Sequence, residues 1–349
     1  MNASAYAHDL LASGWFVFIG FALLLYLVLD GFDLGVGIFA LRCRNEQERS
    51  QLMASIGPFW DANETWLVVA GGALFAAFPA VYATLLTYLM VPLALLLIAV
   101  ILRGVSFEFH HFSPPHLKPL WGYSFGLGSL LMTFALGLMG GAFLQGFPLS
   151  AAGRGFESQV YAGGAWTFLT AFSVASGIGV ALGAALLGVS FLQVRLEEGA
   201  VRRRSQRLRR WLLPLTALYF ASMMIFSLQA LPWLQGVWTG ARLPAFIALA
   251  AVCLGVIWKA WRHGRQQRPF AAFVWTELLV VVTFVGLLLS LFPQFVPQTW
   301  SINAGAAPLS TLGMISVAFA VLLPMLVVAN YYQIWIFRGR LRHDAAYGV

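Results

Sequence analysis

The sequence has few charged residues for its length. Only 10% of its 349 residues are charged and 60% are hydrophobic, whereas a soluble globular protein carries about 25% charged residues. A soluble fold of this size could not cover so much apolar side chain. We therefore expect lipid to be the main solvent of the chain, and we predict an all-α polytopic membrane protein.

The sequence also lacks the residue patterns of the common cofactor sites. Its two cysteines, Cys43 and Cys253, form no Cys-x-x-Cys pair and indicate neither a disulfide framework nor a zinc site. All six histidines fall in expected loops, tails or span ends, whereas haem in a helical bundle takes ligands from within helices. A Walker motif, a dinucleotide fingerprint and a His-Glu-x-x-His motif are absent. We infer that this chain alone binds no haem and no metal.

Apolar segments long enough to cross a bilayer recur along the chain, since a core of about 30 Å takes about 20 helical residues. The first twelve residues contain no Lys or Arg, so we expect the first segment to be a retained helix and not a cleaved signal. Pro79 divides the uncharged stretch 65–102 into two spans, because proline breaks or kinks a helix. The predicted spans, about nine, are 13–41, 55–78, 82–102, 119–144, 160–194, 211–231, 243–261, 270–291 and 309–336.

The basic residues predict the orientation. With the N-terminus outside and the C-terminus cytoplasmic, all but Arg154 and Arg242 of the 21 Lys and Arg residues fall on the inner side, as the positive-inside rule requires. The net charge of +8 is thereby explained without a nucleic-acid partner. The basic run 202–210 divides the chain into an N-terminal membrane half, 1–195 with helices 1–5, and a C-terminal half, 196–349 with helices 6–9, and we expect no soluble domain.

Two pairs of acids lie inside or at the start of predicted spans, where an ionisable side chain costs several kcal/mol and is a functional candidate. Asp30 and Asp33 lie toward the inner end of the first span, and Asp61 and Glu64 open the second. Each pair has the spacing i, i+3, which places both carboxylates on one helix face.

Further ionisable residues belong to the same inner side. Arg103 ends the third predicted span there, and Glu108 follows in the expected loop. Glu277 stands alone in the eighth span, where snorkelling or pairing with an inner-loop arginine is favoured over a buried proton site.

Two interpretations of the inner acids compete. In the structural one, Asp61 and Glu64 favour the dipole of a helix N-terminus, Arg103 anchors the topology, and Asp33 serves helix packing beside glycines that allow close approach. In the functional one, the acids take up protons from the cytoplasm. For Asp61 and Glu108 the residues alone leave both interpretations open.

Three long motifs in the first third of the chain resemble subunit II of cytochrome bd-type quinol oxidases. They are DGFDLGVG at 30–37, WDANETW at 60–66 and GGALFAAFP at 71–79. The Asn63-Glu64 pair is more similar to the cyanide-insensitive branch of that family. The rest of the chain is similar by length and helix count.

The resemblance implies a haem-free second subunit of a terminal oxidase in the bacterial cytoplasmic membrane. The family oxidises quinol on the outer side, reduces dioxygen to water and draws protons from the cytoplasm. Haem b and haem d belong to the partner, subunit I, and the second subunit has two helical bundles plus one extra helix. Small single-helix subunits and a structural quinone or lipid are compatible with the resemblance.

The resemblance also implies roles for single residues. The proton route carries over to Asp61, Arg103 and Glu108, with Glu64 and Asp30 as further candidates, although many relatives have Asp in place of Glu108. Trp66 is a candidate for bordering an oxygen route or for helix packing.

Two other functions compete with an oxidase subunit that takes up protons. A secondary transporter also has many helices and few buried charges, but it places its polar site near the midplane, whereas the acids here gather at the inner end. A purely structural membrane subunit would have no proton role.

Overall fold

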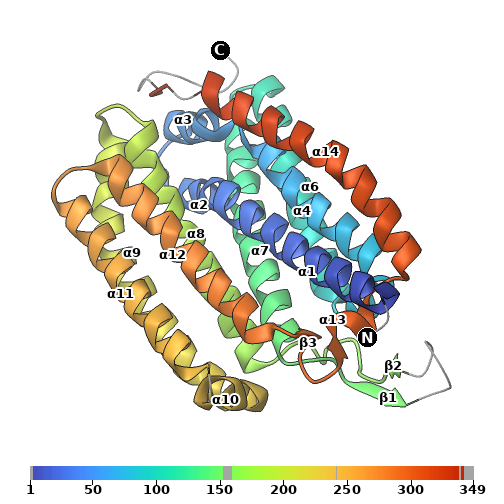
Figure 1. Cartoon of the computed structure of the whole chain (residues 1–349). Helices are drawn as coiled ribbons and strands as arrows, with labels where there is room; N and C mark the ends of the chain where they lie inside the picture. Colours follow the sequence, from blue (N-terminus) through green and yellow to red (C-terminus); the bar gives the residue numbers. More distant parts are fainter. Residues whose placement is uncertain (1–2, 152–158, 241, 338, 342–349) are drawn as a thin grey trace.

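The computed structural model describes residues 3–151, 159–240, 242–337 and 339–341 of the chain. Helices dominate these residues, and Figure 1 shows the long ones running side by side between two ends of the molecule. The helices are α1 Ala3–Leu29, α2 Gly31–Ala40, α3 Glu46–Ile56, α4 Trp60–Ala77, α5 Pro79–Tyr88, α6 Met90–Phe112, α7 Lys118–Leu144, α8 Ala171–Arg195, α9 Ala200–Ala230, α10 Pro232–Thr239, α11 Leu243–Arg265, α12 Pro269–Leu291, α13 Ile302–Gly305 and α14 Leu309–Ile336.

By length and composition, eight helical segments of the described chain could cross a membrane, with α1 and α2 forming one of them. The remaining predicted span, 55–78, is present as α4, which runs beside α1 and α14. The first turns of α4 carry Asp61, Asn63 and Glu64, so this 18-residue helix lacks the long apolar stretch of the other eight segments. The protein is therefore a multi-pass, all-α membrane protein.

The two ends of the helical bundle differ. One end carries two short antiparallel hairpins, β1 Leu149–Ala151 with β2 Gln159–Tyr161, and β3 Gln294–Val296 with β4 Trp300–Ser301. In Figure 1 the short helix α3 and the end of α14 lie at the opposite end, while α1 begins at the hairpin end. The positive-inside rule predicts that the α3 end is the inner one.

Several predicted boundaries were wrong. The first predicted span, 13–41, is one segment formed by α1 and α2 but begins earlier, at Ala3. The third predicted span, 82–102, is divided between α5 and α6 at Leu89. The predicted span 160–194 begins only at 171, because Thr170 and Ser173 form a reciprocal capping box that starts α8 there. The predicted loop after Arg103 is helical, since α6 continues to Phe112 and includes Glu108.

A helix that was not predicted follows the first inner turn. Asn45 caps α3 by accepting a hydrogen bond from the backbone N–H of Glu48 at 2.9 Å. Because this asparagine satisfies a free N–H of the first turn, residues 46–56 form a helix and not the expected loop. The helix lies against α2 and α7 and covers their inner ends.

One pair of glycines lets two helices approach closely, as the sequence predicted for the first span. A Cβ on Gly35 of α2 would lie 1.8 Å from the carbonyl oxygen of Ala184 in α8. A Cβ on Gly188 of α8 would lie 2.2 Å from the carbonyl carbon of Gly35. The backbones of α2 and α8 therefore touch, which fixes the position of the polar residues of α2.

Candidate functional site

A buried arginine joins three helical segments near the inner half of the bundle. Arg103 lies in α6 and has no exposed surface. Its Nη2 donates to Oδ1 of Asp30 at 2.6 Å, and its Nη1 donates to Oδ2 of Asp30 at 3.0 Å and to Oε1 of Glu64 at 2.6 Å. Asp30 belongs to the junction of α1 and α2, and Glu64 to the start of α4. One guanidinium thus bonds to two carboxylates that lie 39 and 73 positions before it in the sequence.

Asp30 lies at the junction of α1 and α2, where its backbone N–H still donates to the carbonyl of Tyr26 at 2.8 Å. Asp30 occupies the N-cap position of α2, where an aspartate commonly accepts a backbone N–H. Here its side chain makes no capping bond, and both of its oxygens instead accept from Arg103. The two-bond geometry is the strong form of an arginine–carboxylate pair.

Asp33 lies in the same region and is also fully buried. Its Oδ2 accepts a hydrogen bond from Nδ2 of Asn63 at 2.7 Å, and the same nitrogen donates to the carbonyl of Leu29 at 2.9 Å. Its Oδ1 has no donor among the described residues. Asn63 was not predicted as a site residue, although its place between Asp61 and Glu64 is a signal that could have identified it.

The charges in this cluster do not balance. Asp30, Asp33 and Glu64 supply three carboxyl groups, and among the described residues Arg103 is the cation that pairs with two of them, Asp30 and Glu64. Burying unpaired charge costs several kcal/mol per ion. A proton taken up by one of the carboxyl groups lowers this excess of negative charge, so the cluster is chemically suited to hold and release a proton.

The structure does not bring every predicted site residue into this cluster. Asp61 and Glu108 are exposed on α4 and α6. Asp61 lies three residues before Glu64 on the same face of α4. Glu108 follows Arg103 by five residues, so it points from a different face of α6.

Trp66 is packed between helices. It is 2% exposed, and its Nε1 donates to Oδ1 of Asn330 in α14 at 2.9 Å. Its ring lies edge-on to Phe21 of α1 with a centroid distance of 6.4 Å. These contacts join α1, α4 and α14 beside the buried cluster and support the packing role among its predicted roles.

A second polar cluster at the inner end was not predicted. The ring Nε2 of the fully buried His110 lies 2.6 Å from Oε1 of Glu46, and Nη1 of Arg49 donates to Oε2 of Glu46 at 2.9 Å. Burial raises the pKa of Glu46, but the hydrogen bonds and charges of His110 and Arg49 outweigh it and lower that pKa below its ordinary value of 4.5. The cluster ties α3 to α6.

Glu277 shows neither of the two arrangements that the sequence favoured, which were snorkelling and pairing with an inner-loop arginine. Both of its carboxylate oxygens are buried and have no hydrogen-bond partner among the described residues, so it neither snorkels to the surface nor pairs with an arginine. The described residues also contain no group of three or more His, Cys, Asp or Glu side chains that could hold a metal ion.

Comparisons with known proteins agree with this architecture. The family model for cytochrome bd terminal oxidase subunit II matches residues 11–337. The chain is 30% identical over 347 residues to a cytochrome bd ubiquinol oxidase subunit 2 of Bacillus subtilis, with 96% of this chain and 97% of that protein covered. It is 26% identical to a cytochrome bd-I ubiquinol oxidase subunit 2 of Escherichia coli K12, with 97% of each covered.

A solved structure shows the same fold. The chain superimposes on a chain of the bd oxidase from Geobacillus thermodenitrificans with a TM-score of 0.76 and 19% identity, covering 94% of this chain and 98% of that one. The sequence motifs, the helical architecture and the match over most of the chain have one explanation. This chain belongs to the cytochrome bd terminal oxidase subunit II family.

Proposed function

We propose that this subunit takes up protons from the cytoplasm for an oxidase that oxidises ubiquinol and reduces dioxygen to water. The relatives from Bacillus subtilis and Escherichia coli are named as ubiquinol oxidase subunits, which supports ubiquinol as the electron donor. Membership of the subunit II family accounts for the membrane helices and the inner acids. The alternative function, a secondary transporter, is not needed to explain them.

The exposure of three neighbouring acids carries the proton proposal. Asp61 is exposed at the start of α4, the side chain of Glu64 one turn later is 14% exposed, and the side chain of Asp30 is fully buried. Glu64 and Asp30 contact the same guanidinium. The acids therefore form a series from the inner surface into the bundle, in the order in which a proton would pass. Arg103 would hold the two inner carboxyl groups in position, and exposed Glu108 would add negative charge at the mouth.

We assign the electron-transfer chemistry to a partner subunit. A haem-bearing subunit I would hold haem b and haem d, which supply quinol oxidation and oxygen reduction when bound. The described residues of α14 are mostly exposed, which supports a role for this helix against lipid or a partner subunit.

Purification of the complex tests this proposal. A tagged form of the chain is purified from a bacterial cytoplasmic membrane in mild detergent, and a reduced-minus-oxidised optical spectrum is recorded. We expect a stoichiometric larger subunit with haem b and haem d bands, and ubiquinol-dependent oxygen consumption. A colourless chain that stays folded without a partner would contradict the proposal.

A further inference from the structure

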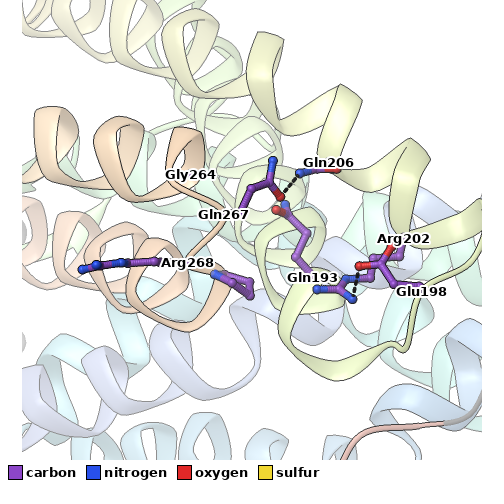
Figure 2. A pocket seen from close by; sticks show the side chains of 8 residues that line it. Gln193, Glu198, Arg202, Gln206, Gly264, Gln267 and Arg268 are labelled. Carbon is purple, nitrogen blue, oxygen red and sulfur yellow. Dashed lines mark hydrogen bonds and ion pairs between the residues drawn. The ribbon is translucent and has the colours of Figure 1, made fainter.

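An open hollow lies at the inner end of the C-terminal half, away from the acid cluster. It is formed by the end of α8, the start of α9 and the turn between α11 and α12, and the space between its lining atoms, open solvent included, is about 300 Å³. Figure 2 shows Arg202 and Arg268 on opposite sides of it in the view. The side chains of Gln193, Gln206 and Gln267 and the backbone of Gly264 line the space between them.

A buried arginine stands directly behind this hollow. Arg209 of α9 is 5% exposed, its Nε donates to Oγ of Ser190 at 3.1 Å, and its Nη2 donates to the carbonyl of Ala260 at 2.9 Å. A Cβ on Gly264 would lie 2.0 Å from Nη1 of Arg209. The glycine, which lines the hollow, therefore leaves room for Nη1 of Arg209 beside it.

The positive charge of this region is not balanced by the described residues. Arg209 has no carboxylate partner among them, although a buried cation is normally paired. Glu198 is the one acid that lines the hollow, and it pairs with Arg202 at 2.6 Å while its side chain remains 75% exposed. Arg202 and Arg268 line the hollow and Arg209 adjoins it, whereas Glu198 is the one acid among its lining residues. The positive charge therefore exceeds the negative charge, and a bound anion would balance it.

The surroundings place the hollow at the level of lipid headgroups. Trp261 is 47% exposed and Phe270 is 66% exposed, and they flank the lining residues Gly264 and Pro269 in sequence. Exposed aromatic residues at span ends mark the membrane interface. Basic pockets between membrane helices on the cytoplasmic side suit acidic lipid headgroups, and an arginine fork matches the oxygens of a phosphate.

We propose that this hollow binds the phosphate of an anionic phospholipid headgroup at the cytoplasmic surface. Arg202 and Arg268 contact the phosphate from its two sides, and Nη1 of Arg209 supplies a further donor beside Gly264. The glutamine amides of Gln206 and Gln267, which already bond each other at 2.7 Å, provide neutral donors at the rim. The lipid thereby supplies the anion that Arg209 lacks.

A charge-matched pair of variants of the purified complex tests the site. The double substitution R202Q/R268Q removes both lining cations. The double substitution R207Q/R210Q removes the same charge from exposed positions of α9 that do not line the hollow. Each complex is incubated with phosphatidylglycerol and phosphatidylcholine in equal amounts, and the retained lipid is counted by native mass spectrometry.

We expect the parent and R207Q/R210Q to retain phosphatidylglycerol in preference to phosphatidylcholine, and R202Q/R268Q to retain it about tenfold less. Equal retention in R202Q/R268Q and the parent would overturn the proposal, as would an equal loss in both double variants. A separate thermal-shift titration uses inorganic phosphate. Saturable stabilisation by phosphate that requires Arg202 and Arg268, without any preference for phosphatidylglycerol, would identify a soluble anion and overturn the lipid.

Discussion

Arg103 and Asp30 form a two-bond ion pair with no exposed surface on either side chain, with Nη2 to Oδ1 at 2.6 Å and Nη1 to Oδ2 at 3.0 Å. The pair joins α6 to the junction of α1 and α2. Because the same guanidinium also contacts Glu64 of α4, it positions acids from two other helical segments. The order of the proposed proton route therefore depends on this one side chain.

Replacing Arg103 with lysine should destabilise the protein. Lysine keeps the positive charge but cannot form the two parallel bonds to Asp30. Losing one of the two charged hydrogen bonds to Asp30 should cost about 1.5–3 kcal/mol. Thermal unfolding of the purified complex and its yield measure this loss. The exposed Arg203→Lys is the matched control and should behave as the parent, and an R103K complex with the parent's stability would contradict the role of the pair.

The close crossing of α2 and α8 predicts a large effect of one methyl group. In G35A the new Cβ would meet the carbonyl oxygen of Ala184 at 1.8 Å, so the two helices must separate. We expect the amount of folded complex recovered from the membrane to fall strongly. Gly14→Ala is the control, because a Cβ at Gly14 meets no atom within 4 Å. Normal recovery of G35A would show that the helices can move apart at little cost.

The inner cluster of Glu46, His110 and Arg49 predicts an acid-sensitive contact between α3 and α6. The folded pKa of Glu46 is lowered below 4.5, the net result of burial opposed by its partners' hydrogen bonds and charges. A lowered folded pKa means that the stabilisation is present above pH 4.5 and is lost as the pH falls through the folded pKa. Thermal unfolding between pH 3 and pH 7 measures it. E46Q should be less stable than the parent near pH 7, and the difference should shrink toward pH 3; a constant difference would argue against this linkage.

The buried carboxyl of Glu277 predicts a tolerated substitution. Its two oxygens have no donor among the described residues, so the ionised side chain is unfavourable there. Glutamine has the same shape without the charge, and E277Q should equal or exceed the parent in thermal stability. E277A tests the alternative, since it removes buried atoms and should destabilise the protein by about 2 kcal/mol or more. A marked loss of stability in E277Q would reveal that the carboxylate has a cationic partner in the assembled complex.

Much of the fold could be predicted from hydropathy because each membrane helix must satisfy its own backbone. The predicted last span, 309–336, coincides with α14, and the spans at 119–144 and 270–291 begin one residue late. The short interruptions at Asp30 and Leu89, on both sides of which backbone hydrogen bonds continue, could not be predicted in the same way. Both lie in sequences that are apolar on either side, so hydropathy continues across them.

The candidate site was predicted only in part. Spacing correctly placed Asp61 and Glu64 on one face of a helix, and the polar residues Asp30 and Arg103 were identified because charge is rare in a membrane span. Their mutual contact depends on how α6 packs against the α1–α2 junction, 73 residues away in sequence. The roles of Asn63 with Asp33 and of Glu46 with His110 likewise arise from packing between distant segments. The division of the chain at residues 195 and 196 stays a prediction.

The most direct test of the proton route is the rate of oxygen reduction by D61N in the purified complex. Asp61 is exposed, so its removal should leave assembly and the haem spectrum unchanged, and E197Q, another exposed acid of the inner end, is the matched control. If protons enter through Asp61 and Glu64, ubiquinol-driven oxygen consumption by D61N should fall by about tenfold or more, while E197Q keeps the parent's rate. An unchanged rate in a D61N complex with a normal haem spectrum would contradict the route.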